Sequence, residues 1–179
     1  MAAKRLTFGA ALLALTACGL DTVSTEQAPC PRIVILADGA DLTRFRPDAG
    51  RDLTGLVVDA RLVGFTARCD FTGRDRTALE VRVTPRFEAE RGPGAAGRTA
   101  ELPWFAALTN PGDAELLDRP GFTARATFAP NTARAVVDGQ TARLTFPVGT
   151  DRPASAHTIR LSFQLTPDEL ALNRARGPR

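Results

Sequence analysis

Apolar and polar residues alternate one by one through much of this chain, and this pattern limits the folds that it can adopt. The clearest case runs from Leu79 to Glu90, where Leu, Val, Phe and Ala alternate with Glu, Arg and Thr. Side chains of a β-strand point alternately to the two faces of a sheet, so each such segment has an apolar face that must be covered. Alternation of this kind predicts strands at 32–36, 56–71, 79–90, 102–109, 122–128, 133–137, 142–148 and 157–165.

Seven or eight amphipathic strands with polar outer faces can share one core when two sheets pack together. The sequence therefore predicts an all-β fold, an antiparallel two-sheet β-sandwich of immunoglobulin- or fibronectin-like topology. A small β-barrel is the alternative. A short helix is expected after the last strand, because Thr166, Pro167 and Glu169 have the positions of an N-cap, a first-turn proline and a capping-box glutamate.

Several places depart from plain alternation. The apolar phase slips by one residue near Leu62, Val63 and Gly64, which predicts a β-bulge. Pro85 cannot donate to a β-ladder, so an edge or a bulge is expected there. Asp138-Gly139, between two apolar alternations, predicts a hairpin turn. Of the less patterned segments, 41–45 is expected to form one helical turn and 115–120 a loop.

The N-terminus has the pattern of an export signal. Lys4 and Arg5 form a basic head, and the twelve residues from Leu6 to Ala17 carry no charge. This apolar run is too short to cross a bilayer, which takes about 20 residues. The run ends in Leu-Thr-Ala-Cys, which resembles the lipobox of bacterial lipoproteins.

The lipobox resemblance implies cleavage between Ala17 and Cys18, attachment of a diacylglycerol to the Cys18 thiol, and acylation of the new amine. Each methylene of an acyl chain that enters the bilayer contributes about 0.8 kcal/mol of binding free energy, and stable anchoring takes at least two membrane signals. The three chains on Cys18 would exceed this requirement. Gly19 follows Cys18, whereas an Asp at this position of Gram-negative lipoproteins often signals retention in the inner membrane. We therefore expect a protein anchored in the outer membrane and facing the periplasm, with the inner membrane as the weaker alternative. A plain secreted protein is the other interpretation of the signal.

Cleavage would leave 162 of the 179 residues, which suits one domain. We expect the signal peptide at 1–17, the lipidated cysteine and a polar tether at 18–29, the sandwich at 30–166, and the short helix and tail at 167–179.

The chain as a whole resembles a family of uncharacterised lipoproteins from alphaproteobacteria. The segments that carry the resemblance are LTAC, CPRIVIL, DLTRF, GRDLTG and RGPGAAGRTAELPWF. The resemblance covers most of the mature chain. It implies the lipid anchor and the compartment, and it adds no mechanism.

The chain has three cysteines. With Cys18 assigned to lipid, Cys30 and Cys69 remain, and an even pair in an exported chain predicts a disulfide. The bond would close a loop of 40 residues, for which the chain-entropy model gives about 4 kcal/mol of stability. Two buried free thiols are the alternative.

The formal net charge is +3. Lys4 and Arg5 lie in the predicted signal, so the chain from Cys18 onward carries +1 by the same counting, and its arginines are interspersed with acids. This balance does not predict nucleic acid as a partner. A single His and no C-x-x-C motif predict no metal site. No cofactor is expected beyond the covalent lipid on Cys18.

Few residues are candidates for chemistry. His157 begins a strand on its apolar face, which is more typical of a core histidine than of a general base. Asp38, Asp41 and Asp48 lie in one loop, but their spacing matches no EF-hand for calcium. The glycine-rich segment 91–98 lacks the lysine of a phosphate-binding loop.

Trp104 and Phe105 are the best candidates for partner binding, because exposed aromatic side chains can anchor a protein or a sugar. Ordinary packing in the core is the alternative for both. We therefore expect a non-enzymatic binding or scaffolding module of the cell envelope, held to the membrane by its lipid, with an envelope protein as partner. The alternative is an envelope hydrolase acting on glycan or peptide. It would need His157 or paired carboxylates in a deep pocket, since no G-x-S-x-G motif is present.

Overall fold

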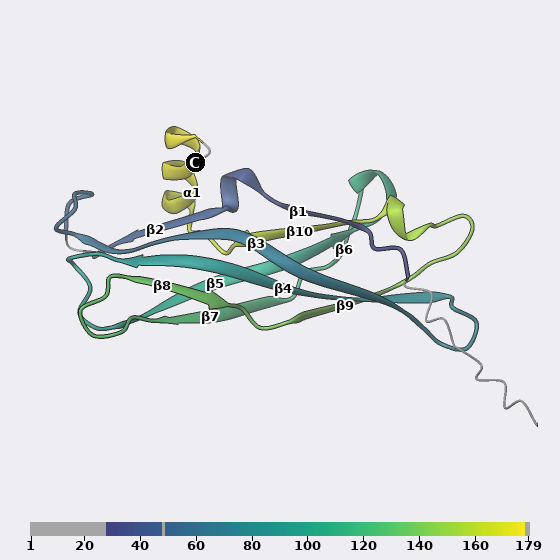
Figure 1. Cartoon of the computed structure of the whole chain (residues 1–179). Helices are drawn as coiled ribbons and strands as arrows, with labels where there is room; N and C mark the ends of the chain where they lie inside the picture. Colours follow the sequence, from purple (N-terminus) through teal and green to yellow (C-terminus); the bar gives the residue numbers. More distant parts are fainter. Residues whose placement is uncertain (1–27, 48, 178–179) are drawn as a thin grey trace, which may run out of the picture.

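Two β-sheets pack face to face in the computed structural model, which describes residues 28–47 and 49–177 (Figure 1). The predicted β-sandwich is confirmed, and the sheets do not close into a barrel. The predicted signal peptide, the Ala17–Cys18 cleavage site and Asp48 lie outside the described residues.

The first sheet, sheet A, has five strands in the order β1-β10-β5-β6, with β7 also paired to β5. The short β1 runs parallel to β10, and the other pairs are antiparallel. The strands are β1 (Arg32–Ile35), β5 (Thr99–Thr109), β6 (Leu116–Asp118), β7 (Gly121–Thr127) and β10 (Thr158–Phe163).

The second sheet, sheet B, has the order β2-β3-β4-β8, with β9 also paired to β4. All its pairs are antiparallel, and the long hairpin of β3 and β4 forms its centre. The strands are β2 (Asp41–Phe45), β3 (Leu56–Thr72), β4 (Ala78–Arg91), β8 (Arg134–Asp138) and β9 (Ala142–Pro147).

The alternation in the sequence decides which side chains form the core. On β4, Leu79, Val81, Val83 and Phe87 are fully buried, while their polar neighbours face outward. Aromatic rings join the sheets across the core, where Phe87 of sheet B lies 5.2 Å from Phe163 of sheet A between ring centroids. The burial of such apolar side chains makes the largest favourable contribution to the free energy of folding.

The predicted β-bulge is present. Leu62 pairs with Phe87 and Gly64 with Arg86, so Val63 is the extra residue of β3. The insertion shifts the inward positions by one, which brings Cys69 into the core with no exposed surface.

The predicted disulfide between Cys30 and Cys69 is confirmed, with a Cα–Cα distance of 5.4 Å. Cys30 precedes β1 of sheet A, and Cys69 lies on β3 of sheet B. The bond therefore connects the two layers at the start of the described chain.

The predicted hairpin at Asp138-Gly139 is wrong. Strands β8 and β9 do not pair with each other but run in the same direction along successive halves of β4. The interruption between them faces Pro85, which lacks an N–H, and the Gly139 N–H donates to the Pro85 carbonyl over 2.8 Å. Gly139 has no positive φ, so its lack of a side chain serves close packing rather than a turn. Pro85 thus lies in the inner strand β4, paired with Phe65 of β3, and not at the expected edge or bulge; the sheet accommodates it through the interruption between β8 and β9.

Two further expectations for local structure are wrong. Residues 41–45 form β2, because Leu42 enters the core and the segment pairs with β3; the helical turn lies just before, at η1 (Ala37–Gly39). The segment 115–120 contains the short β6, which pairs with the end of β5. Pairing with another strand determined both segments, and the alternation within a segment does not report it.

The predicted C-terminal helix is α1 (Pro167–Arg176), and its capping box is formed by Thr166 and Glu169 in both directions. This helix is short, and no helix in the described residues is long and apolar enough to cross a bilayer.

Replacing Gly139 tests the packing explanation. A Cβ there would lie 2.8 Å from Pro85 Cγ and 3.0 Å from Phe87 Cε2. We expect Gly139→Ala to lower the free energy of unfolding by about 1–3 kcal/mol, as overpacked cores do. Gly97→Ala is the control, because nothing lies within 4 Å of its added Cβ. Equal denaturant midpoints for the two variants would contradict the packing role of Gly139.

Candidate functional site

The structure separates the two adjacent aromatic residues that the sequence marks for binding. Trp104 points inward from β5, is fully buried, and stacks on Phe122 with 4.7 Å between ring centroids. Phe105 points outward and is half-buried. Only Phe105 is therefore placed where a partner can reach it.

Phe105 forms the floor of a groove on the outer face of sheet A. Ser162 lies beside it, because β5 and β10 pair Phe105 with Ser162. The groove encloses about 520 Å³, within the range of ligand-binding clefts. We call it the Phe105 groove; its walls include Leu36, Phe105, Arg119, Leu165, Leu170 and Arg174.

One wall of the Phe105 groove is η1, which crosses directly over β10. A Cβ on Gly39 would lie 1.9 Å from Ser162 Oγ, so only glycine allows the backbone this close. The Ser162 hydroxyl donates to the carbonyl of Phe163 over 2.8 Å. The sequence pattern ADGAD therefore positions the wall through a contact that is distant in the chain.

The other wall is α1, which polar contacts hold against η1 and β2. Asn173 donates from Nδ2 to the carbonyls of Asp38 (2.9 Å) and Asp41 (2.8 Å). Glu169 accepts from Arg44 Nε over 3.0 Å as well as from its own helix N-terminus. These contacts orient Leu170 and Arg174 toward the groove.

The groove combines an apolar floor with a guanidinium group at two of its sides. The Arg119 guanidinium stacks on the Phe105 ring, 4.0 Å from its centroid, and forms no ion pair with the described residues. Arg174, in contrast, is paired with Asp38 over 3.0 Å. A cation stacked on an aromatic ring is available for a carboxylate or phosphate group. The groove can therefore accept a segment that carries apolar side chains and one anionic group.

His157 lies elsewhere, at a pocket of about 440 Å³ near one end of the sandwich. Its ring is buried, packs on Phe146 at 4.5 Å, and places Nδ1 3.3 Å from the Pro153 carbonyl. Among the described residues no hydroxyl, thiol or carboxylate is bonded to it. A general base needs such a partner or substrate within hydrogen-bond reach.

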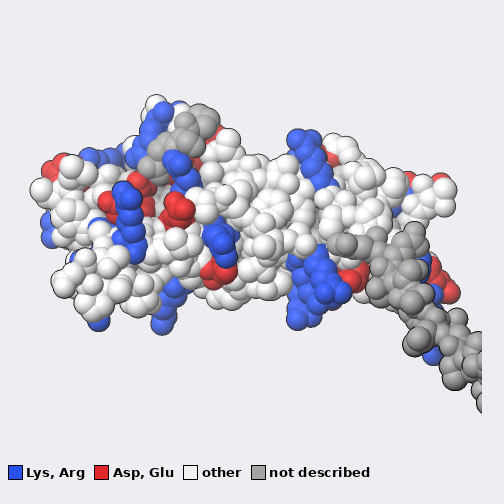
Figure 2. Space-filling view, viewed as in Figure 1, with Lys and Arg blue, Asp and Glu red and all other residues white. Residues whose placement is uncertain are grey.

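Two carboxylates face each other on the outer surface of sheet B, where Asp59 pairs with Glu90 across β3 and β4. They line a shallow pocket of about 450 Å³ together with Arg61 and Arg134. Acidic and basic side chains lie next to one another on this face (Figure 2). Asp59 accepts from Thr43 over 2.9 Å, and Glu90 lies 3.3 Å from Arg134. Both carboxylates are thus engaged with neighbouring side chains.

Asp38 and Asp41, two of the three aspartates considered as calcium ligands, pair with different arginines. Asp38 pairs with Arg174, and Asp41 pairs with Arg61 over 3.1 Å. In residues 28–47 and 49–177, no group of three His, Cys, Asp or Glu side chains is arranged to hold a metal ion.

Sequence patterns identified Phe105 but missed the residues that make its groove. Arg119 lies in a polar connection, and Leu36, Leu165 and Leu170 belong to three separate segments. The capping box was the one signal in the sequence for this part of the groove. It predicted where α1 begins, but it could not predict the face of the sandwich on which α1 packs.

A bidentate ion pair joins Asp113 to Arg160. Hydrogen bonds from Arg160, one of them 2.8 Å long, and from Thr109 hold the pKa of Asp113 well below its ordinary value of 3.8. The contact ties the connection after β5 to β10, beside the pocket of His157.

Acid should remove this contact. Because the folded state lowers the pKa of Asp113, its stabilisation is present above pH 3.8 and is lost as the pH falls further. We expect the Asp113→Asn variant to have a lower melting temperature than the wild type at pH 7. The difference in melting temperature should shrink below about pH 4. Asp151→Asn, in an exposed turn, controls for the loss of one charge. A melting difference that is independent of pH would contradict this role of Asp113.

Comparisons of this chain with models of protein families, with curated proteins and with solved structures find no match.

Proposed function

We propose that this chain is a lipid-anchored module of the cell envelope that binds a protein partner through the Phe105 groove. The observation that carries the proposal is the Arg119 guanidinium, which is stacked on a half-buried phenylalanine and has no ion pair within the described chain. Aromatic and arginine side chains carry much of the binding energy of protein interfaces once a partner covers them.

The groove also indicates the chemistry of the partner. Leu36, Leu165 and Leu170 are only half-buried, so a ligand would cover apolar surface that water now contacts. Arg119 would pair with a carboxylate at the rim. An extended segment of an envelope protein with apolar side chains and one acidic group fits both features.

Anchoring rests on the sequence and gains support from the disulfide. Disulfides persist in oxidising compartments such as the periplasm, and the Cys30–Cys69 bond is therefore consistent with an exported chain. Export leaves Cys18, next to the lipobox residues, as the thiol for lipid. Helix α1 lies toward one end of the sandwich, and the start of the described chain, in purple, lies toward the other (Figure 1).

Binding is favoured over hydrolysis by what surrounds the titratable groups. His157 is buried against Phe146, and Asp59 and Glu90 bond to neighbouring side chains. The Phe105 groove, by contrast, presents half-buried leucines and an arginine, Arg119, that forms no ion pair with the part of the chain that the structure describes.

Crosslinking in cells tests the proposal. A photoreactive residue in place of Gln164, at the rim of the groove, should give an adduct with an envelope protein in the membrane fraction. Truncating a hot-spot residue costs about 2 kcal/mol or more, roughly 30-fold in affinity, so Phe105→Ala should strongly reduce the adduct.

Phe71→Ala is the matched control, because Phe71 is also half-buried and carries an arginine, Arg76, over its ring. It should leave the adduct unchanged. Equal adducts from Phe105→Ala and from the unaltered chain, or recovery of the protein outside the membrane fraction, would contradict the proposal.

A further inference from the structure

We propose that three arginines on the outer face of sheet B dock the domain onto the anionic phospholipid headgroups of the membrane that holds it. These residues, Arg68, Arg82 and Arg143, are called the arginine row. The inference rests on the lipid anchor of the proposed function and adds an orientation to it.

The arginine row follows from the strand register. Arg68 of β3 lies directly opposite Arg82 of β4, and Arg82 lies directly opposite Arg143 of β9. Like charges in directly opposite positions destabilise a sheet. Two carboxylates on the same face offset part of this repulsion, but the three guanidinium groups carry more charge than these acids neutralise, which points to an external anion.

Carboxylates within the protein neutralise only part of this charge. Asp70 contacts both Arg68 and Arg82, and Glu80 lies 3.0 Å from Arg82 Nε. Arg143 is exposed and forms no ion pair with the described residues. Basic side chains gather over β4 and β9 on the molecular surface (Figure 2).

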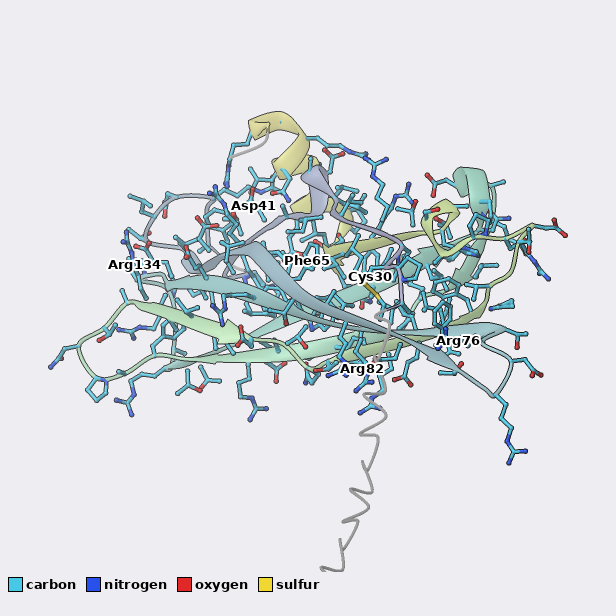
Figure 3. All side chains as sticks on the ribbon, turned by 45° about the vertical axis from the view of Figure 1, so that its right-hand side comes forward. Cys30, Asp41, Phe65, Arg76, Arg82 and Arg134 are labelled. Carbon is cyan, nitrogen blue, oxygen red and sulfur yellow. A yellow bond between two sulfur atoms is a disulfide. The ribbon has the colours of Figure 1, made fainter. Side chains whose placement is uncertain are left out.

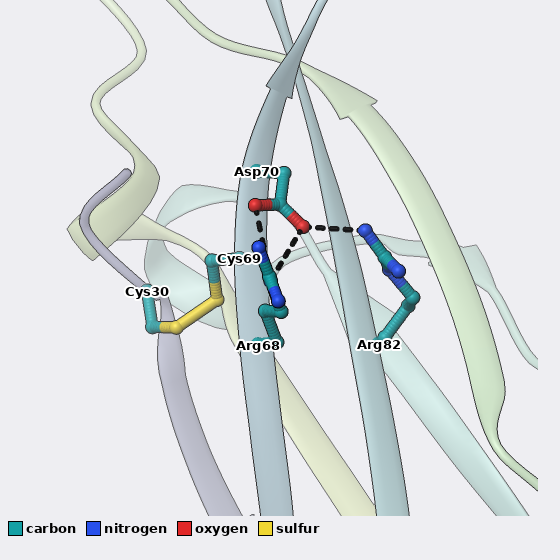
Figure 4. Close-up of a disulfide and its surroundings, with 5 residues drawn as sticks. All are labelled: Cys30, Arg68, Cys69, Asp70 and Arg82. Atoms are coloured by element: carbon teal, nitrogen blue, oxygen red, sulfur yellow. Dashed lines mark hydrogen bonds and ion pairs between the residues drawn. A yellow bond between two sulfur atoms is a disulfide. The ribbon is translucent and has the colours of Figure 1, made fainter. Parts of the chain in front are cut away.

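The arginine row lies where the chain enters the domain. Cys30 is bonded to Cys69, the residue between Arg68 and Asp70 (Figure 4). Arg82 lies on the outer side of sheet B, and Cys30 on the other side of β3 (Figure 3). Only residues 19–29 separate Cys30 from the proposed lipid on Cys18, and eleven residues span at most about 35–40 Å.

This proximity selects the membrane as the source of the anion. The attraction of basic residues to an anionic leaflet falls off within a Debye length, about 8–10 Å in physiological salt. A short tether keeps the row near that surface, and guanidinium groups bind phosphate through paired hydrogen bonds. The row lies along a sheet face rather than in a deep cleft, which suits a surface of headgroups better than a small enclosed ligand.

Vesicle binding without the lipid tests the inference separately from the anchor. The probe is the mature chain with Cys18→Ser, exported by a cleavable signal in place of residues 1–17. At low ionic strength it should sediment with vesicles of phosphatidylcholine and phosphatidylglycerol, and not with phosphatidylcholine alone. One arginine near an anionic surface contributes about fivefold in partitioning, so Arg68→Gln with Arg143→Gln should weaken binding about 25-fold.

The control is Arg98→Gln with Arg125→Gln, which removes the same charge from exposed positions outside the row. It should change binding much less. An equal loss of vesicle binding for the two double variants would overturn the proposed role of the arginine row. Binding to vesicles of phosphatidylcholine alone would overturn it as well. Release of the protein from the vesicles by inorganic phosphate, but not by chloride of equal ionic strength, would assign the arginine row to free phosphate. It would overturn the proposal that the row binds the membrane. Each of these outcomes is independent of whether Cys18 carries lipid.

Discussion

The Cys30–Cys69 disulfide is the constraint on which the arrangement of the two proposed surfaces depends. Strand β1 has four residues and pairs only with β10, so its ladder alone holds the start of the domain weakly. The disulfide closes the loop that contains β1, η1 and β2, and it contributes about 4 kcal/mol in the chain-entropy model. Because η1 is a wall of the Phe105 groove, this wall lies within the loop that the bond closes. The same bond brings the end of the tether to the arginine row.

The two proposed surfaces divide the molecule by function. The arginine row lies beside the point where the chain enters the domain, whereas the Phe105 groove lies toward the other end and on the other sheet. A domain held by lipid and turned by its arginines would present the groove to the periplasm. The arginines of the two surfaces also differ in their partners. Arg119 of the groove is stacked on the Phe105 ring, whereas Arg68 and Arg82 of the arginine row share the carboxylate of Asp70.

Alternation predicted the sandwich, and a one-residue phase slip predicted the bulge at Val63, because both are properties of a single strand. The capping box likewise predicted the start of α1. Partners in space were beyond the sequence. Gly139 has the neighbours of a hairpin glycine, yet it packs on Pro85 and Phe87. Residues 41–45 form a strand because β3 is beside them. Of the proposed groove only Phe105 could be identified from the sequence, since Arg119 and the leucines converge from separate segments.

The three cysteines have distinct proposed states, and mass spectrometry of peptides from the native membrane protein under non-reducing conditions measures them directly. We expect an N-terminal peptide that begins at Cys18 and carries a diacylglycerol and an acyl chain. We also expect a linked pair of peptides containing Cys30 and Cys69. An unmodified Cys18, or a Cys18 in disulfide linkage with Cys30 or Cys69, would contradict the proposed lipid anchor.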